Sequence, residues 1–564
     1  MKNQSSIKVA VLAIIAVVAC VTLEARTVTV NISSIPKNAN IASALNNKFK
    51  GLTYDDTAVI NFDRSGTYTI DEVVSLKCNV VVSGTGADNT ILILNKDDNK
   101  PLKGADAFLS FTGKLGRPIT VSLSDLSIKL KEHKGIWWEN SAFHAVKIYH
   151  ADRIDIRNVN SYMSNAIITN FDLRVCSNVT VENCILSNYN NCNASGILWL
   201  RGDMHNINIH HNKIYKYGND EAVAFFGTTV DANKNMKGNI SRTNIRVTDN
   251  EFYYKHNDKV IDDLYMSMYL SVLTAETDRS QYTSNTQGFE VARNRFEADD
   301  LCKRFVYFQF CVDDQHSDIS VHDNEFVSNP VESNGKFYRM DIDVWDSSTQ
   351  QDTIVVRDNT MTNYYPLMNP YSGTGYTFLL VRGGNVVLDG NKINNHVTTG
   401  PDGKPYGINL LWSGQEGGSV TLRNNVCKGL ARIITLESGK GIGHFSLNAN
   451  NNYFQGRTSI YCAKIDRLDL DFRNNTFESN HNYFFLQDFA NKGTVVFNNN
   501  KVTVSSGYGR LMGHWGNGNT YSMKFDRLEV KGNEFHGVKN QSELLKDITN
   551  VRKRTVKSNT YYQK

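Results

Sequence analysis

The chain has 564 residues, a hydrophobic fraction of 40%, a charged fraction of 21% and a formal net charge of +4. This composition is ordinary for a folded protein, and no long run of like charge points to a nucleic-acid partner. The 9 cysteines show no Cys-x-x-Cys or Cys/His metal spacing, so we expect buried thiols, with a pairing of Cys302 and Cys311 left open.

Residues 1–25 have the pattern of an export signal. Lys2 and Lys8 precede an apolar run, Val9–Val21, that is too short to span a bilayer. Val17–Cys20 resembles a bacterial lipobox, which would make Cys20 a lipid anchor, whereas Leu23–Ala25 fits an ordinary cleavage site. We therefore expect a bacterial protein that is secreted or held at the cell surface, for example as an outer-membrane lipoprotein, with residues 26–564 as one domain.

The next stretch, Asn40–Phe49, predicts a short helix. Ile41, Ala44, Leu45 and Phe49 recur at helical spacing. Because a stack of strands leaves unpaired backbone groups at its open end, we expect this helix to cap the N-terminal end of the fold.

One unit then recurs through most of the chain, and Asp318–Phe326 shows it clearly. Ile319 and Val321 precede Asn324, and Phe326 follows it, which is the alternation of a strand with one buried face. The corner residue of each unit is an asparagine: Asn158, Asn183, Asn212, Asn250, Asn294, Asn324, Asn359, Asn391, Asn425, Asn452, Asn475, Asn500, Asn533 and Asn559.

Regular self-similarity at this short period predicts a solenoid. A second apolar strand, such as Phe305–Val312, follows each corner, and no helical stretch lies between the units. Two strands per repeat, stacked coil on coil, predict an all-β, right-handed parallel β-helix with an N-terminal cap. Repeated corner asparagines would then stack as a ladder of amides.

This repeat resembles that of the pectate lyase and polygalacturonase superfamily, from roughly Asn79 to the C-terminus. The resemblance implies a protein that acts on a polysaccharide. We expect a monomer with no nucleic-acid partner and no membrane contact beyond a lipid on Cys20.

Loop lengths predict where a binding groove lies. The longest spacings between corner residues fall between Asn212 and Asn294, and extra residues in a solenoid form loops on one side. We expect the groove within about residues 195–350, with Trp199, Arg201 and Trp345 as sugar-binding side chains. The short, regular coils from Asn452 to Asn500 predict a structural role.

Carboxylates in this region are the candidate catalytic groups. Gly218–Phe225 resembles the Gly-Asp-Asp segment of polygalacturonases, which implies an acid–base role for Asp220 and Glu221. The match is partial, since an Asp before Gly196 and a Gly-His-Gly segment are missing. Asp263 and Asp300 stand before the corresponding strands of the next two coils, so stacking at about 4.8 Å predicts separations of about 5 and 10 Å. Such separations fit glycosidase chemistry, and the resemblance implies an inverting mechanism.

A rival pair is Asp341 and Asp343. If Met340, Ile342 and Val344 face inward, these two carboxylates face outward beside Trp345, about 6.8 Å apart.

Two further functions stay open. A polysaccharide lyase acting on uronates would use Asp299 and Asp300 to hold Ca²⁺, with Lys303 and Arg304 nearby. A non-catalytic glycan-binding or adhesin-like module would use the same face without chemistry. A hydrolase needs no cofactor, and we predict no metal site apart from Ca²⁺ in a lyase.

Overall fold

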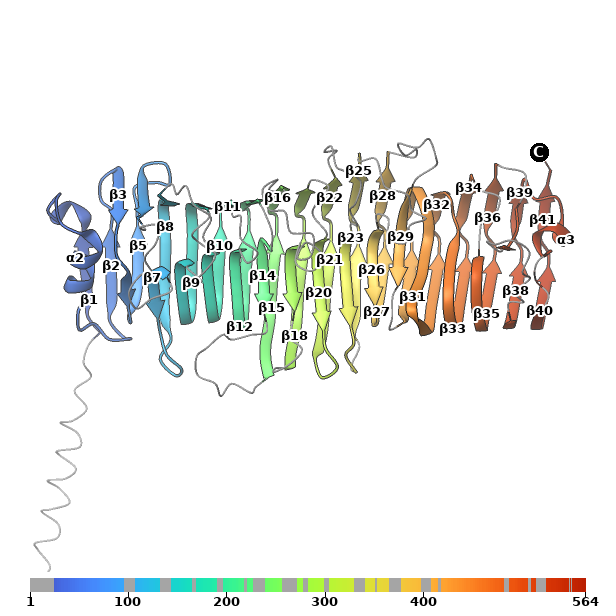
Figure 1. Cartoon of the computed structure of the whole chain (residues 1–564), viewed down its shortest axis with the longest axis horizontal. Helices are drawn as coiled ribbons and strands as arrows, with labels where there is room; N and C mark the ends of the chain where they lie inside the picture. The colour runs from blue at the N-terminus through green and yellow to red at the C-terminus, as the bar shows by residue number, and fades with distance from the viewer. Residues whose placement is uncertain are drawn as a thin grey trace, which may run out of the picture.

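The computed structural model is an elongated solenoid, with β1 (Thr27–Asn31) near one end and β41 (Thr560–Tyr562) near the other (Figure 1). It describes residues 25–95, 107–131, 144–164, 169–189, 196–217, 221–226, 239–255, 271–276, 283–298, 304–328, 340–349, 352–364, 377–396, 407–413, 417–480, 486–505, 509–513, 524–546, 548 and 550–563. None of the helices in these ranges is long and apolar enough to cross a membrane. The proposed export signal and Cys20 lie outside them.

A typical coil contributes one strand to each of three faces. Within one coil, β20 (Arg304–Phe310) lies on the first face, β21 (Gln315–His322) on the second and β22 (Glu325–Ser328) on the third, after the corner at Asn324. Each strand pairs in parallel with the matching strand of the next coil. The predicted all-β parallel β-helix is therefore confirmed, but the sequence predicted two strands per coil and overlooked the short one directly after the asparagine.

The remaining strands follow the same order, and the longest of them turn from one face to the next. The first face contains β4 (Val74–Leu76), β7 (Ala107–Thr112), the starts of β9 (His144–Ser164), β10 (Thr169–Glu182) and β12 (Gly196–His210), β14 (Val223–Phe226), β17 (Ser271–Glu276), β23 (Met340–Asp346), β26 (Thr377–Arg382), β29 (Ile408–Ser413), the middle of β31 (Val426–Asn450), the starts of β33 (Ile460–Arg473) and β35 (Leu486–Asn498), and β37 (Met512–Gly513). The second face contains β1 (Thr27–Asn31), β2 (Thr57–Asn61), β5 (Asn79–Ser83), β8 (Ile119–Leu130), parts of β9, β10 and β12, β15 (Asn239–Thr248), β18 (Thr283–Ala292), β24 (Thr353–Arg357), β27 (Asn385–Asp389), β30 (Gly418–Arg423), the later parts of β31, β33 and β35, β38 (Lys524–Lys531) and β40 (Asn550–Lys557). The third face contains β3 (Gly66–Ile70), β6 (Thr90–Leu94), the ends of β8 and β9, β11 (Ile185–Tyr189), β13 (Lys213–Tyr217), β16 (Glu251–Lys255), β19 (Arg295–Ala298), β25 (Thr360–Asn363), β28 (Lys392–Asn395), the start of β31, β32 (Tyr453–Gly456), β34 (Thr476–Ser479), β36 (Lys501–Val504), β39 (Glu534–His536) and β41 (Thr560–Tyr562).

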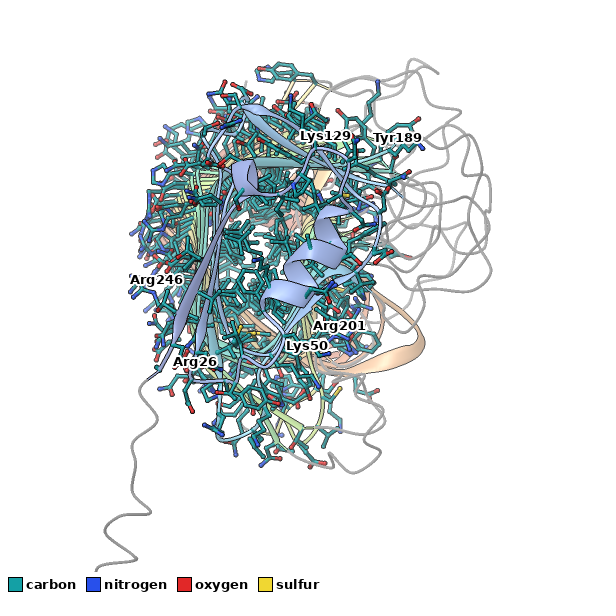
Figure 2. All side chains as sticks on the ribbon, turned by 90° about the vertical axis from the view of Figure 1, so that its left-hand side faces the viewer. Arg26, Lys50, Lys129, Tyr189, Arg201 and Arg246 are labelled. Atoms are coloured by element: carbon teal, nitrogen blue, oxygen red, sulfur yellow. The ribbon has the colours of Figure 1, made fainter. Side chains whose placement is uncertain are left out.

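Figure 2 looks along the solenoid from its N-terminal end and separates these faces: Arg246 lies on the second face, Arg201 on the first, and Lys129 and Tyr189 on the third.

The core fills the space between the faces. Alternate side chains of each strand are buried, as predicted for Ile319, Val321 and Phe326. Like residues stack from coil to coil: the ring of Phe296 lies 4.8 Å from that of Phe252 and 5.3 Å from that of Phe326. Full burial of such a side chain contributes about 1.5–3 kcal/mol, so regular repetition makes the stack stable.

The predicted asparagine ladder is present. The Nδ2 of Asn324 donates to Oδ1 of Asn359 at 3.0 Å, and the backbone N–H of Asn324 donates to the same oxygen at 3.0 Å. The second Nδ2 proton of Asn324 is bound by the carbonyl of Val291 at 2.8 Å. Amide-to-amide bonds of this kind link Asn212, Asn250, Asn294, Asn324, Asn359, Asn391, Asn425, Asn452, Asn475, Asn500, Asn533 and Asn559.

Asn158 and Asn183 do not belong to this ladder, contrary to the prediction. Both have positive φ, 53° and 54°, and so occupy the left-handed position that Asp323, with φ of 54°, holds just before Asn324. Asparagine adopts this conformation readily, which is why it recurs at two neighbouring positions of the corner. In the coil of Asn183, the ladder position belongs to Cys184, whose N–H donates to Oδ1 of Asn212 at 3.0 Å.

The predicted N-terminal helix is α2 (Ile41–Lys48), and Figure 1 shows it at the N-terminal end of the solenoid. Asn40 caps it by accepting from the backbone N–H of Ser43 at 2.9 Å. Asn46 bonds to the neighbouring coil through Nδ2 to the Val73 carbonyl, at 2.7 Å. Two short helices, η1 (Ile32–Ser34) and α3 (Gln541–Leu544), complete the described elements.

The described cysteines are free thiols, and most are buried: Cys78, Cys176, Cys184, Cys311, Cys427 and Cys462. Burial raises the pKa of Cys176 to about 12, so this thiol is inert at neutral pH. Cys302 lies outside the described residues, so its pairing with Cys311 stays open.

Candidate functional site

The outward side of the first face carries charged and aromatic side chains that lie outside the hydrophobic core. Val306, Ile342 and Leu379 are level with one another and point into the core. Outward side chains come from the residues one and three positions further along a strand and, in some strands, from the residue two positions earlier. We call the following outward side chains the outer layer: His144, Asp172, Arg174, Trp199, Arg201, Phe226, Arg304, Tyr307, Asp343, Trp345, Arg382, Arg432, Thr435 and Tyr461.

One centre of the outer layer is Asp343. Its Oδ2 lies 2.8 Å from Nε of Arg304, on the preceding coil, and 2.6 Å from Nη2 of Arg382, on the following coil. The Arg304 guanidinium lies 4.1 Å from the ring centre of Tyr307, and that of Arg382 lies 4.3 Å from the ring centre of Trp345. Asp343 is fully buried although it points away from the core, because these groups enclose its carboxylate.

A second centre of the same design surrounds Asp172. Its carboxylate oxygens lie 3.2 Å from Nε2 of His144, 2.6 Å from Nη2 of Arg174 and 3.2 Å from Nε of Arg201. The Arg201 guanidinium lies 4.3 Å from the ring centre of Trp199. Burial raises the pKa of Asp172, but His144, Arg201 and Arg174 lower it by more, so the net shift is downward and the carboxylate stays ionised.

A fourth Arg–aromatic pair lies further along the first face. The Arg432 guanidinium is 4.5 Å from the ring centre of Tyr461, and its Nη1 donates to Oγ1 of Thr435 at 3.3 Å. The same combination of guanidinium and ring therefore recurs along the solenoid axis. Buried charges held by partners outside the core are typical of functional sites.

The predicted pair of Asp341 and Asp343 is not an open pair of carboxylates. Asp341 is fully buried and level with Phe305 and Phe378, which belong to the core. Adjacent residues Asp341 and Ile342 both lie on the inner side, so the strict alternation assumed from the sequence fails at the start of this strand. Asp343 does point outward but is occupied by two arginines. Trp345 is half-buried beneath Arg382 rather than an open platform.

Trp199 and Arg201 lie together on the first face, and both are mostly buried, while their role in binding sugar stays a prediction. The indole of Trp199 lies over Gly196, where an added Cβ would stand 2.0 Å from Nε1. Glu221 is buried two residues before β14 begins, at the level of Gly196. Asp220, Asp263 and Asp300 lie outside the described residues, as do Asp299 and Lys303, so their roles stay predictions.

Among the described residues, no group of three or more His, Cys, Asp or Glu side chains has the arrangement of a metal site.

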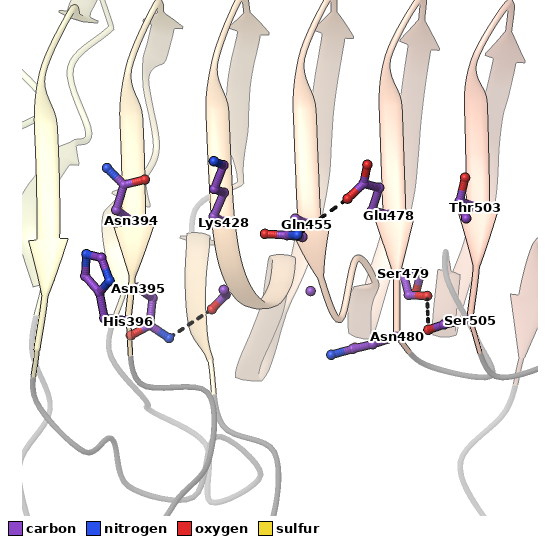
Figure 3. A pocket seen from close by; sticks show the side chains of 12 residues that line it. Asn394, Asn395, His396, Lys428, Gln455, Glu478, Ser479, Asn480, Thr503 and Ser505 are labelled. Atoms are coloured by element: carbon purple, nitrogen blue, oxygen red, sulfur yellow. Dashed lines mark hydrogen bonds between the residues drawn. The ribbon is translucent and has the colours of Figure 1, made fainter.

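A groove opens elsewhere, on the third face. Its cavity volume is about 560 Å³, and it is lined by Asn394, Asn395, His396, Lys428, Gly429, Gln455, Gly456, Glu478, Ser479, Asn480, Thr503 and Ser505. Figure 3 shows five of these side chains in a line on successive strands: Asn394, Lys428, Gln455, Glu478 and Thr503.

The sequence did not point to this groove. Its coils are short and regular, so loop length carried no signal. The sequence does carry one signal for it: polar residues recur three positions after the corner asparagines, for example Gln455 after Asn452 and Glu478 after Asn475.

No protein-family model and no curated protein matches the sequence. Among solved structures, the chain is similar to the tailspike gp61 of Pseudomonas phage phi297, at 11% identity and a TM-score of 0.36, over 74% of this chain and 76% of that one. It is also similar to the catalytic unit of a GH87 α-1,3-glucanase from Streptomyces thermodiastaticus strain HF3-3, at 12% identity and a TM-score of 0.31, over 88% of this chain and 66% of that one. A GH87 α-1,3-glucanase catalytic domain in complex with nigerose matches at 11% identity and a TM-score of 0.27, over 95% and 69%.

Similarity this distant concerns the general fold and not activity. The specific resemblance to the pectate lyase and polygalacturonase superfamily stays a prediction.

Proposed function

We propose that this chain is an exported protein that acts on a polysaccharide, with glycoside hydrolysis as the first candidate reaction. The observation that carries the proposal is the outer layer of the first face. Arg–aromatic pairs and buried carboxylates repeat there along one axis, as a long glycan would require. Aromatic rings stack on sugars, and fixed guanidiniums and carboxylates bind hydroxyls or acidic substituents.

The catalytic carboxyls we propose are Asp220 and Asp263. They precede β14 and β17 in the chain. Both strands belong to the first face: β14 pairs with the strand of Trp199 and Arg201, and β17 pairs with β14. Hydrolysis needs one carboxyl that gives a proton and one that activates water. Asp172 does not suit the first role, because its arginine partners and His144 keep it ionised.

A screen against plant, algal and host polysaccharides tests the proposal, with products read as new reducing ends and by ultraviolet absorbance. We expect reducing ends without ultraviolet absorbance. Asp220→Asn or Asp263→Asn should then lower the rate about 10²–10⁴-fold with the fold intact. Full activity in both variants would contradict the assignment of Asp220 and Asp263. If no polysaccharide is cleaved, the result favours the alternative that the chain is a non-catalytic glycan-binding module.

A polysaccharide lyase is the second candidate, because arginines dominate the outer layer. Arg201, Arg304 and Arg382 lie on one face and are suited to bind the carboxylate of a uronate. A lyase would release an unsaturated product that absorbs in the ultraviolet. Loss of activity with a chelator, restored by Ca²⁺, would support the predicted calcium site.

Export is tested by mass spectrometry of the mature N-terminus. A lipid on Cys20 or a start near Arg26 agrees with it, whereas an intact Met1 on the native protein rejects it.

A further inference from the structure

We propose that the groove on the third face is a second carbohydrate site, separate from the first face, that binds a neutral polysaccharide strand along the solenoid axis. The five side chains in line, Asn394, Lys428, Gln455, Glu478 and Thr503, come from five successive coils. Because neighbouring coils lie about 4.8 Å apart, this line spans about 19 Å, which suits an extended chain rather than a small molecule.

The floor of the groove is made by glycines. Gly429 has φ of 73°, and a Cβ there would lie 2.6 Å from the carbonyl oxygen of Asn395. Gly456 has φ of 120°, and a Cβ there would lie 2.5 Å from the carbonyl oxygen of Leu430. The chain turns sharply at both, and no side chain rises from either position. The cavity of about 560 Å³ is therefore built into the corner between the third face and the first.

The polar groups of the groove are held in place before any ligand arrives. The Oε2 of Glu478 accepts from the hydroxyl of Tyr453 at 2.6 Å. It also accepts from Nε2 of Gln455 at 3.4 Å (Figure 3). The Asn395 amide donates to the Gly429 carbonyl at 3.0 Å and accepts from Asn363 at 2.9 Å. Burial and the Glu478 carboxylate raise the pKa of Tyr453 to about 12, so its hydroxyl remains a donor at neutral pH.

The chemistry of the lining fits uncharged sugar hydroxyls. Amides, hydroxyls, one ammonium and one carboxylate line the groove, and the two charges of Lys428 and Glu478 cancel. A sugar hydroxyl both donates and accepts hydrogen bonds, so it matches this mixed set of donors and acceptors. The carboxylate of an acidic sugar would be repelled by the carboxylate of Glu478. At one end, the ring of His396 lies parallel to that of Tyr364 at 4.9 Å, and Tyr364 is 49% exposed, which leaves a flat aromatic surface for a sugar ring.

The test is binding of the full chain to soluble neutral polysaccharides (mannan, xylan, dextran and laminarin) and to acidic ones (alginate and polygalacturonate). We expect at least one neutral polysaccharide to bind. Glu478→Gln and Gln455→Ala should weaken that binding about tenfold or more, since each removes hydrogen bonds, one of them charge-assisted.

The matched control is Glu251→Gln. Glu251 also lies on the third face and also accepts from a tyrosine hydroxyl, that of Tyr253, at 2.6 Å, but it lies outside the groove. Its loss should leave binding unchanged. Circular dichroism and the thermal midpoint establish that each variant is folded.

The proposal is overturned if none of the neutral polysaccharides binds, if Glu478→Gln and Gln455→Ala bind as tightly as the unchanged chain, or if Glu251→Gln weakens binding equally. The result is independent of the first-face reaction: Asp220→Asn should keep groove binding, and Glu478→Gln should keep cleavage of a short substrate.

Discussion

At the residue scale, the arginine pairs around Asp343 make this carboxylate a structural centre of the first face. Asp343→Asn leaves the guanidiniums of Arg304 and Arg382 next to each other without their shared counter-charge. We expect a loss of about 3 kcal/mol in the free energy of unfolding, measured by chemical denaturation, because removing one partner of a buried ion pair leaves the other charges buried and uncompensated.

Asp389→Asn is the matched control for that change. Asp389 pairs with Arg423 at 2.7 Å on the second face, but the arginine is 53% exposed. Its loss should cost less than about 1 kcal/mol. Equal losses in the two variants would show that the enclosure of Asp343 contributes nothing.

A pH effect on stability is expected from Glu529, also at the residue scale. Hydrogen bonds from Lys531 and then Arg527 lower its pKa from 4.5 to about 2. A carboxyl whose pKa is lowered in the folded state stabilises the fold above its unfolded pKa, and this contribution is lost as the pH falls from about 4.5 to about 2. Glu529→Gln should therefore lower the thermal midpoint at pH 6 and have a much smaller effect at pH 2.5. An equal change of the thermal midpoint at pH 6 and pH 2.5 would contradict a contribution from the ionised carboxylate of Glu529.

At the element scale, each internal asparagine of the ladder holds four groups. Asn359 accepts from the N–H and Nδ2 of Asn324 and donates to the Val321 carbonyl and to Oδ1 of Asn391. Asn359→Ala removes these four bonds. Oδ1 of Asn391 keeps the backbone N–H of residue 359, at 3.1 Å, and each group left unsatisfied costs about 1–3 kcal/mol. We expect a loss of at least about 3 kcal/mol in the free energy of unfolding.

Asn158→Ala is the control for the ladder. Asn158 is exposed, and its amide makes one bond, to Asp125 at 2.6 Å. Alanine in its left-handed conformation should cost about 1–2 kcal/mol. A loss as large as that of Asn359→Ala would mean that ladder membership is not what matters.

The comparison of sequence and structure is also sharpest at this scale. Alternation around Asn324 predicted the buried residues and the stacked amides, because both depend on local geometry that repeats. Local geometry did not separate the ladder position from the left-handed position before it, since asparagine suits both. The burial of Asp341 was missed because the alternation of inward and outward side chains breaks at this residue. The break is visible only once the strand is paired with β20 and β26.

At the scale of the whole molecule, a solenoid has no single centre, because every coil contacts only its neighbours. Its local stability should therefore follow local burial. Most residues of β40 are exposed and none is buried, whereas β21 has buried residues at intervals along its length. In hydrogen exchange, the amides of β40 should exchange faster than those of β21. Uniform protection would indicate one cooperative unit.

The candidate functional site was predictable only in outline. Long spacings pointed to residues 195–350, and the structure places Trp199 and Arg201 of this range in contact on the first face. The ion pairs that join Asp172 to Arg201 and Asp343 to Arg304 and Arg382 link neighbouring coils across 29 to 39 positions, and no spacing rule identifies them. The groove of the third face arises where loops are short, so a rule based on loop length leads away from it.

The asparagine ladder has a consequence for electrical polarity. From Asn212 to Asn533, every ladder amide donates one Nδ2 proton in the same direction, to the asparagine of the following coil, and Asn559 accepts the last of these bonds. Aligned dipoles polarise one another, so each bond strengthens its neighbours. The ladder is therefore a chain of mutually polarised amides. A substitution at Asn359 should weaken the hydrogen bonds on either side of it. The losses of unfolding free energy on substituting Asn324 and Asn391 should depend on each other, although these side chains are two coils apart.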